Sequence, residues 1–184
     1  MTEQQIAEII VVVGHPDLSE SRINAALVHE LEGLPAVQVR TLHELYPDGQ
    51  IDFDAERTAL ESAQNIVLQY PLYWYSTPGL LKQWLDEIMT RGWAYGTGKP
   101  GVLKGKTLRV AISNGGVQDA YQPEGFHGWP IRQVLIPMEA LAKRLGVIWL
   151  EPQIIHGTWD LTDEQLAARA ARYRELLTLR DLAA

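Results

Sequence analysis

Five short runs of apolar residues alternate along the chain with segments of helical periodicity, and this alternation constrains the fold more than any other feature. The runs typical of buried strands are 9–14, 36–42, 65–74, 106–113 and 146–157. The helical segments are 22–34, 54–63, 78–91 and 131–146, which Pro137 should bend or break, and a last helix from Thr162 with a Thr-x-x-Gln capping box. Strands that alternate with helices predict a parallel sheet covered by helices on both faces.

The order of the strands follows from the rules of chain connection. Crossovers between parallel strands are nearly always right-handed, which leaves few topologies. We predict a single α/β domain over residues 1–184, a flavodoxin-like three-layer sandwich with a five-stranded parallel sheet in the order 2-1-3-4-5. Ligands of such sheets bind beyond the carboxyl ends of the strands, so the loops after strands 1, 3 and 4 should converge on one ligand.

The composition of the chain excludes several classes of function. The net charge is −7, and no basic stripe indicates a nucleic-acid binder. Cysteine is absent, which excludes disulfides and thiolate chemistry, and the histidines lack the spacing of a metal site. We expect no signal peptide, and no apolar run approaches the roughly 18 residues of a membrane span. The expected location is the cytoplasm.

The loop after the first strand, GHPDLSES (14–21), leads into a helix and is a candidate phosphate site. Unpaired N–H groups and a partial positive charge at a helix N-terminus favour a phosphate. The side chains that could assist are His15, Ser19, Ser21, Arg22 and Asn24. The alternative is that Ser19 or Ser21 simply caps the helix.

The loop after the third strand, QYPLYWYSTPG (69–79), is crowded with aromatic side chains. A flat aromatic ligand could rest on this loop, held by backbone groups and by a stacked ring. The alternative is that Tyr73, Trp74 and Tyr75 pack into the core or into a subunit contact.

The loop after the fourth strand combines close backbone approach with two polar rings. Asn114, Gly115 and Gly116 allow the backbone to come near a ligand. The irregular segment that follows carries Tyr121 and His127, a phenol and an imidazole. Taken alone, a loop histidine is usually solvated and a tyrosine usually packs. Neither a nucleophile elbow nor His-Glu-x-x-His is present.

Together these stretches resemble the NAD(P)H:quinone oxidoreductases of the flavodoxin-like superfamily. The matching stretches are GHP, SRIN, PLYWYSTPGLLKQWLDEIMTRGWAYG, and NGG followed by Tyr121 and FHG. The chain is most similar to the short bacterial members, which include the ancillary proteins of glutathione-regulated potassium efflux antiporters, and YPDGQIDFDAE (46–56) is typical of that branch. The resemblance extends from about Ile9 to about Gly157.

The resemblance implies a flavin cofactor, NAD(P)H as hydride donor and a quinone-like acceptor. The family's cofactor positions fall on His15, Ser21, Arg22, Ile23 and Asn24 for the phosphate, on Pro71, Leu72, Tyr73, Trp74 and Tyr75 for the ring, and on Ser113, Asn114, Gly115 and Gly116 for the glycine loop. Ser113-Asn114 stands where the family often has Thr-Thr. The chain also lacks the C-terminal extension of the large animal enzymes, which favours FMN, with FAD as the alternative.

The resemblance also implies a role for Tyr121 and His127. Tyr121 and His127 are expected to be catalytic, because they can hydrogen-bond or protonate the flavin edge that becomes negative on reduction. A homodimer is implied, with the site at a twofold interface. The aromatic residues expected to meet there are Trp93, Tyr95, Phe126 and Trp129. A broad apolar stripe on the helix from Pro78, with ordinary helix-on-sheet packing as its alternative, supports the same expectation: Leu80, Leu81, Trp84, Leu85, Ile88 and Met89.

Three functions are therefore compared. The first is a flavin-dependent NAD(P)H oxidoreductase that passes a hydride through the flavin to a quinone-like acceptor by two-electron ping-pong reduction. The second is a regulatory subunit of a potassium efflux antiporter with secondary redox activity, which would place the protein at the inner face of the cell membrane. The third is a small electron carrier like flavodoxin, for which a paired phenol and imidazole are not needed.

Overall fold

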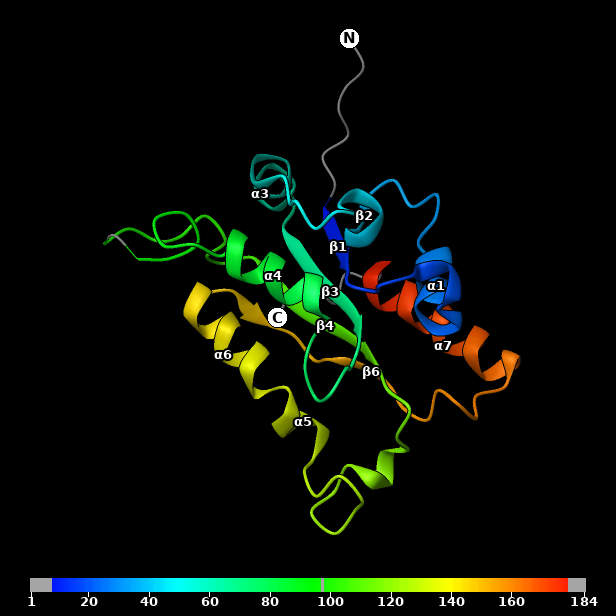
Figure 1. Ribbon diagram of the computed structural model, residues 1–184. Helices are drawn as coiled ribbons and strands as arrows, with labels where there is room; N and C mark the ends of the chain where they lie inside the picture. The colour runs from blue at the N-terminus through cyan, green and yellow to red at the C-terminus, as the bar shows by residue number, and fades with distance from the viewer. Residues whose placement is uncertain (1–7, 97, 179–184) are drawn as a thin grey trace.

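Helices cover both faces of a central parallel sheet in the computed structural model, which describes residues 8–96 and 98–178 (Figure 1). The strands are β1 (Ile9–Val13), β2 (Val37–Thr41), β3 (Asn65–Pro71), β4 (Thr107–Ser113), β5 (Ile148–Trp149) and β6 (Gln153–Ile155). The α-helices are α1 (Arg22–His29), α2 (Leu42–Leu45), α3 (Phe53–Ser62), α4 (Gly79–Ile88), α5 (Ile131–Val134), α6 (Ile136–Leu145) and α7 (Asp163–Thr178). Two 3-10 helices are η1 (Leu18–Glu20) and η2 (Gln118–Ala120). Within the described ranges, no helix is both long enough and apolar enough to span a bilayer.

The predicted strand order 2-1-3-4-5 is confirmed, and every pair of neighbouring strands is parallel. The expected fifth strand is divided into β5 and β6, which both pair with β4. Leu108 lies opposite Trp149 and Ala111 opposite Gln153, so the edge strand has one extra residue and bulges there. The buried guanidinium of Arg109 donates to the carbonyl of Glu151 inside this bulge, which gives that carbonyl a hydrogen-bond partner.

Side chains of β1 alternate between two apolar cores because successive residues of a strand face opposite sides of the sheet. Ile10 and Val12 pack beneath α3, α4 and α6, whereas Val11 and Val13 pack beneath α1 and α7. Four residues of the α4 stripe are buried in the first core: Leu81, Trp84, Leu85 and Ile88. The other two, Leu80 and Met89, pack against the same core. Helix-on-sheet packing therefore accounts for this stripe, which no longer argues for a dimer.

Helix boundaries differ from the expected ones where glycine or proline intervenes. The helix predicted over 22–34 ends at His29, and turns lead to Gly33, whose φ is +72°. The segment 131–146 forms two helices, α5 and α6, that meet at Leu135, which confirms the predicted break near Pro137. The capping box at α7 is confirmed: the N–H of Thr162 donates to Gln165 Oε1 at 3.0 Å, and the N–H of Gln165 donates to Thr162 Oγ1 at 3.2 Å.

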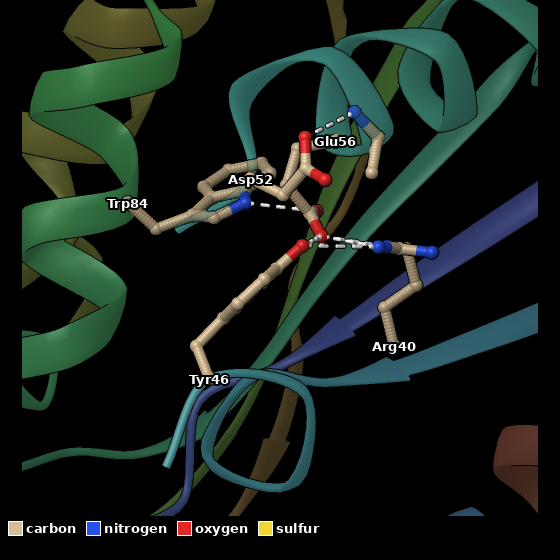
Figure 2. Close-up of polar contacts among 6 residues, drawn as sticks. Arg40, Tyr46, Asp52, Glu56 and Trp84 are labelled. Carbon is tan, nitrogen blue, oxygen red and sulfur yellow. Dashed lines mark hydrogen bonds and ion pairs between the residues drawn. The ribbon is translucent and has the colours of Figure 1, made fainter. Parts of the chain in front are cut away.

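A buried carboxylate joins α3 to α4, the helix that continues from the aromatic loop (Figure 2). Glu56 has no exposed surface. One of its oxygens accepts hydrogen bonds from Arg40 and from the Tyr46 hydroxyl, the latter at 2.5 Å. Its other oxygen accepts from the indole N–H of Trp84 at 2.9 Å. The network thereby connects β2, the 46–52 segment, α3 and α4 beneath the sheet.

Candidate functional site

Loops from the carboxyl ends of β1, β3 and β4 enclose a cavity of about 490 Å³, as expected for the switch point of this sheet. A fourth segment, after β6, completes it. Eleven of the expected cofactor residues line the cavity: His15, Ser21, Arg22, Ile23, Asn24, Pro71, Leu72, Tyr73, Ser113, Asn114 and Gly115. Glu20, Thr158 and Trp159 line it as well, and no pattern in the sequence singled them out.

Ser21 and Asn24 connect the first loop to the glycine loop. Ser21 Oγ accepts from the N–H of Asn24 at 3.2 Å, so Ser21 caps α1 and lines the cavity at the same time. The Asn24 amide nitrogen also donates to Ser113 Oγ at 3.2 Å. Because all three side chains are buried, this contact fixes the start of α1 against the end of β4. Ser19 does not line the cavity and instead donates to Asp17 at 2.6 Å.

Arg22 and His15, the two basic residues expected at the phosphate, have different partners. Arg22 Nη2 donates to the Leu161 carbonyl at 2.8 Å and to Asp163 at 2.6 Å, which ties α1 to the start of α7. His15 Nδ1 accepts from the N–H of Asp17 at 3.2 Å, and burial lowers the pKa of His15. A neutral His15 accepting at Nδ1 carries its proton on Nε2, which is thereby available to a ligand oxygen.

The aromatic loop divides into a part that lines the cavity and a part that leaves it. Pro71, Leu72 and Tyr73 belong to the wall. Trp74 and Tyr75, which were expected in the wall, are not among the residues that line the cavity, and both adopt positive φ angles, 47° and 64°. Such backbone conformations are uncommon for bulky residues and are frequent at functional sites. The indole of Trp74 is 92% exposed.

Tyr121 and His127 stack on each other beside the cavity. Their ring centroids lie 4.1 Å apart at an interplanar angle of 21°. Gly116 lies below the stack, where a Cβ atom would come within 2.6 Å of His127 Nε2. The Tyr75 hydroxyl lies 3.1 Å from His127 Nδ1, so that the aromatic and glycine loops meet at this histidine. Burial raises the pKa of Tyr121, which keeps its phenol protonated and able to donate.

The far side of Tyr121 borders a second hollow of about 440 Å³, lined in part by His156 and Arg132. His156 Nδ1 lies 3.3 Å from the side-chain amide of Asn114, and burial lowers the pKa of this histidine. His156, which directly follows β6, thereby contacts the glycine loop. Among the residues with described coordinates, no group of three or more His, Asp or Glu is arranged to hold a metal ion.

Residues 7–177 match the family model described as flavodoxin-like fold. The chain belongs to this family. Among its relatives, the ancillary protein KefF of the glutathione-regulated potassium-efflux system of Klebsiella aerogenes is 38% identical over 170 residues, covering 92% of this chain and 94% of KefF. A KefF from an Enterobacter species is 40% identical over the same length.

Two solved structures superpose closely on this chain. General stress protein 14 of Treponema denticola, solved in complex with FMN, has a TM-score of 0.88 at 32% identity and covers 92% of this chain and 97% of its own. An NADPH-quinone reductase of P. pentosaceus has a TM-score of 0.85 at 27% identity, covering 94% and 98%. The family membership agrees with the strand order and with a ligand cavity at the carboxyl edge of the sheet.

Proposed function

We propose that this protein is a flavin-dependent NAD(P)H oxidoreductase that reduces a quinone-like acceptor by two electrons in a ping-pong sequence. One observation carries the proposal: the glycine loop that lines the cavity at the carboxyl ends of β1, β3 and β4 continues into Gly116, against which the stacked pair Tyr121 and His127 packs. The FMN complex of the Treponema protein and the quinone-reductase activity named for the P. pentosaceus protein support it.

The residues around the cavity fit a cofactor with a phosphate and a flat ring. Ser21, Ile23 and Asn24 at the start of α1, with neutral His15, offer hydrogen-bond donors for the phosphate, and Arg22 offers a positive charge. Pro71, Leu72 and Tyr73 offer an apolar wall for the ring, and Ser113, Asn114 and Gly115 offer the polar floor. We propose FMN as the cofactor, and FAD is the alternative. When bound, the flavin supplies the redox chemistry by accepting a hydride from NAD(P)H and passing two electrons to the acceptor.

The two stacked rings supply protons and hydrogen bonds. Because its pKa is raised by burial, Tyr121 stays protonated across the neutral range and can donate from its phenol. His127 is oriented by three contacts: the Tyr121 ring, the edge of Phe126 and the Tyr75 hydroxyl. A donor held in place stabilises developing negative charge without having to reorganise during the reaction.

A visible spectrum of the purified protein, followed by anaerobic addition of NADPH and then NADH, tests the proposal. We expect absorption bands near ~450 nm that bleach on addition of a nucleotide and return when a quinone is added. Extraction of the released flavin distinguishes FMN from FAD. A protein that neither carries nor takes up flavin would contradict the proposal. A protein that holds flavin but is reduced by neither nucleotide would favour the carrier or regulatory function.

A second candidate function is regulation of a potassium efflux antiporter. Its support is the similarity to KefF, which is named as an ancillary protein of such a system and aligns over 92% of this chain. The test is co-purification of the protein with an antiporter expressed from the same cells, and measurement of potassium efflux with and without the protein. Efflux that does not depend on the protein would contradict this function.

We also propose a homodimer. Its support is the group of exposed rings near the site, because isolated chains rarely leave several large aromatic side chains together in water. Trp74 and Phe126 are each 92% exposed and Trp129 is 63% exposed. The other two expected interface residues have partners within the chain. Trp93 donates to Glu61 at 2.7 Å, and the guanidinium of Arg144 lies 4.5 Å from the ring centroid of Tyr95.

A further inference from the structure

Trp159 places a large aromatic ring beside the cavity without packing it into the core. Its side chain is 86% exposed, yet it forms part of the cavity lining with Asn114 and Gly115. An indole in this position leaves most of its apolar surface in contact with water. Covering that surface with a ligand would contribute favourable free energy, because apolar area would be removed from water.

The backbone on either side of Trp159 is hydrogen-bonded to the glycine loop. The N–H of Gly157 donates to the carbonyl of Gly116 at 2.9 Å, and the N–H of Thr158 donates to the carbonyl of Asn114 at 3.2 Å. The N–H of Asp160 donates back to the Gly157 carbonyl at 3.1 Å and closes a turn around Trp159. The tryptophan is therefore carried by a segment attached to the cavity floor.

The indole lies directly over Gly115. A Cβ atom at Gly115 would come within 2.7 Å of Trp159 Cδ1 and would overlap Nε1. Only the bare backbone of a glycine leaves room for the ring at this distance. Gly115 and Trp159 thus form one continuous surface, even though they lie far apart in the sequence.

Residues other than Trp159 lie at the end of the cavity that we propose for the phosphate. Arg22 is held by Leu161 and Asp163, which follow Trp159 in the chain and turn away toward α1 and α7. The indole of Trp159 lies against Gly115, and the backbone on its N-terminal side is hydrogen-bonded to the glycine loop. The ring is therefore positioned toward the part of a ligand that rests on the glycine loop.

We infer that Trp159 is a ligand-contacting residue of this site, whose indole covers the riboflavin part of the bound flavin and not its phosphate. The inference rests on the proposed function, since it requires that a flavin occupies the cavity. It adds to the three loops a fourth binding element, the segment after β6, that contributes affinity through ring contact.

Binding of riboflavin and FMN to the flavin-free protein separates ring contact from phosphate contact. For Trp159→Ala we expect the dissociation constant to rise by about ten- to thirty-fold for both ligands equally, since an aromatic contact and its buried area are lost. Trp159→Phe should keep most of the affinity. For Arg22→Ala we expect weaker binding of FMN with little change for riboflavin. This variant therefore shows how loss of a phosphate contact differs from loss of a ring contact.

A fluorescence measurement and a control variant test the role of Trp159 without relying on enzyme activity. Quenching of tryptophan fluorescence by riboflavin should decrease in Trp159→Phe, although its affinity is nearly retained, because the indole next to the bound ring is gone. The matched control is Phe53→Ala, which removes an exposed aromatic ring outside the cavity and should leave both affinities unchanged. If Trp159→Ala does not fold, Trp159→Gln replaces it in the titration.

The outcomes distinguish this inference from the proposed function. If the wild-type protein binds flavin and the Trp159 variants bind both ligands as tightly, the inference is wrong and the proposed function stands. If Trp159→Ala weakens FMN but not riboflavin, the ring serves the phosphate and the inference is also wrong. If the wild-type protein binds no flavin at all, the proposed function itself fails.

Discussion

The carboxylate of Glu56 on α3 accepts a hydrogen bond from the indole N–H of Trp84 on α4 at 2.9 Å, and neither side chain has exposed surface (Figure 2). The same carboxylate pairs with Arg40, so a buried ion pair and a buried indole share one acceptor. The contact links α3 to α4, the helix that follows the aromatic loop in the chain.

We expect Glu56→Ala to lower the free energy of unfolding by about 3–5 kcal/mol, because it leaves the largely buried Arg40 cation without its partner. Trp84→Phe should cost about 1–3 kcal/mol, since one carboxylate oxygen loses its donor. Urea denaturation followed by circular dichroism measures both. Lys82→Ala, which breaks an exposed ion pair on α4, is the control and should have little effect. A small change in Glu56→Ala would contradict the importance of this network.

Stability in alkaline solution should depend on Tyr46. Burial, followed by the hydrogen bond to Glu56 and its negative charge, raises the pKa of Tyr46 to about 12. A tyrosine with a raised pKa in the folded state favours folding below its unfolded pKa of about 10, and this contribution disappears as the pH rises through the folded value. The free energy of unfolding should therefore fall between pH 10 and about 12. The free energy of unfolding of Tyr46→Phe should fall less steeply over that range. An equal slope in the variant and the wild type would contradict the role of Tyr46 in this pH dependence.

Removal of the Tyr121 hydroxyl or of the His127 imidazole should slow reduction of the flavin without releasing it. Hydrogen bonds to charged groups contribute roughly 1.5–3 kcal/mol, which corresponds to about a ten- to hundred-fold change in rate. We expect losses of this size for Tyr121→Phe and His127→Ala in anaerobic stopped-flow reduction by NAD(P)H. The flavin dissociation constant should change little, because neither ring lines the cavity. Wild-type reduction rates in both variants would remove these residues from the mechanism.

Gly116→Ala tests whether the geometry of the stack matters. A Cβ atom there would lie 2.6 Å from His127 Nε2 and 2.9 Å from Tyr121 Cε2, so the two rings must move apart or tilt. We expect slower flavin reduction by roughly ten-fold with retained flavin, because the donors would leave their positions. Gly79→Ala is the matched control, since a Cβ atom at Gly79 meets no atom within 4 Å. Equal rates in the two variants would show that the position of the stack is not critical.

Sedimentation velocity at micromolar concentration tests the dimer. We expect a dimer for the wild-type chain and a shift toward monomer when Phe126 and Trp129 are both replaced by Asp, because charge would be buried in the interface. Phe53→Asp, a charge placed on another exposed ring, should leave the dimer intact. A wild-type protein that sediments as a monomer would contradict the proposal.

The local sequence pattern determined most of the fold. Strand β1 is buried on both faces, and this environment requires the continuous β-branched run that identifies it in the sequence. The break near Pro137 and the capping box of Thr162 and Gln165 follow from interactions between residues a few positions apart. Because the loops after parallel strands must meet at one edge, the position of the cavity could also be predicted, and the family resemblance supplied most of its lining.

Tertiary structure decided the features that depend on contacts between distant segments. The edge strand divides in two because it carries one residue more than β4 and because Arg109 supplies a donor to the Glu151 carbonyl. Trp159 enters the site only because the segment around it is hydrogen-bonded to the glycine loop.

The same holds for the direction in which side chains of a loop point. Trp74 has the same aromatic character as Tyr73, yet Tyr73 lines the cavity whereas Trp74, which has a positive φ, does not. A sequence determines which residue types stand at the end of a strand. The backbone angles and the long-range hydrogen bonds of the folded chain determine which of them face the ligand, because each of these depends on partners brought together only by folding.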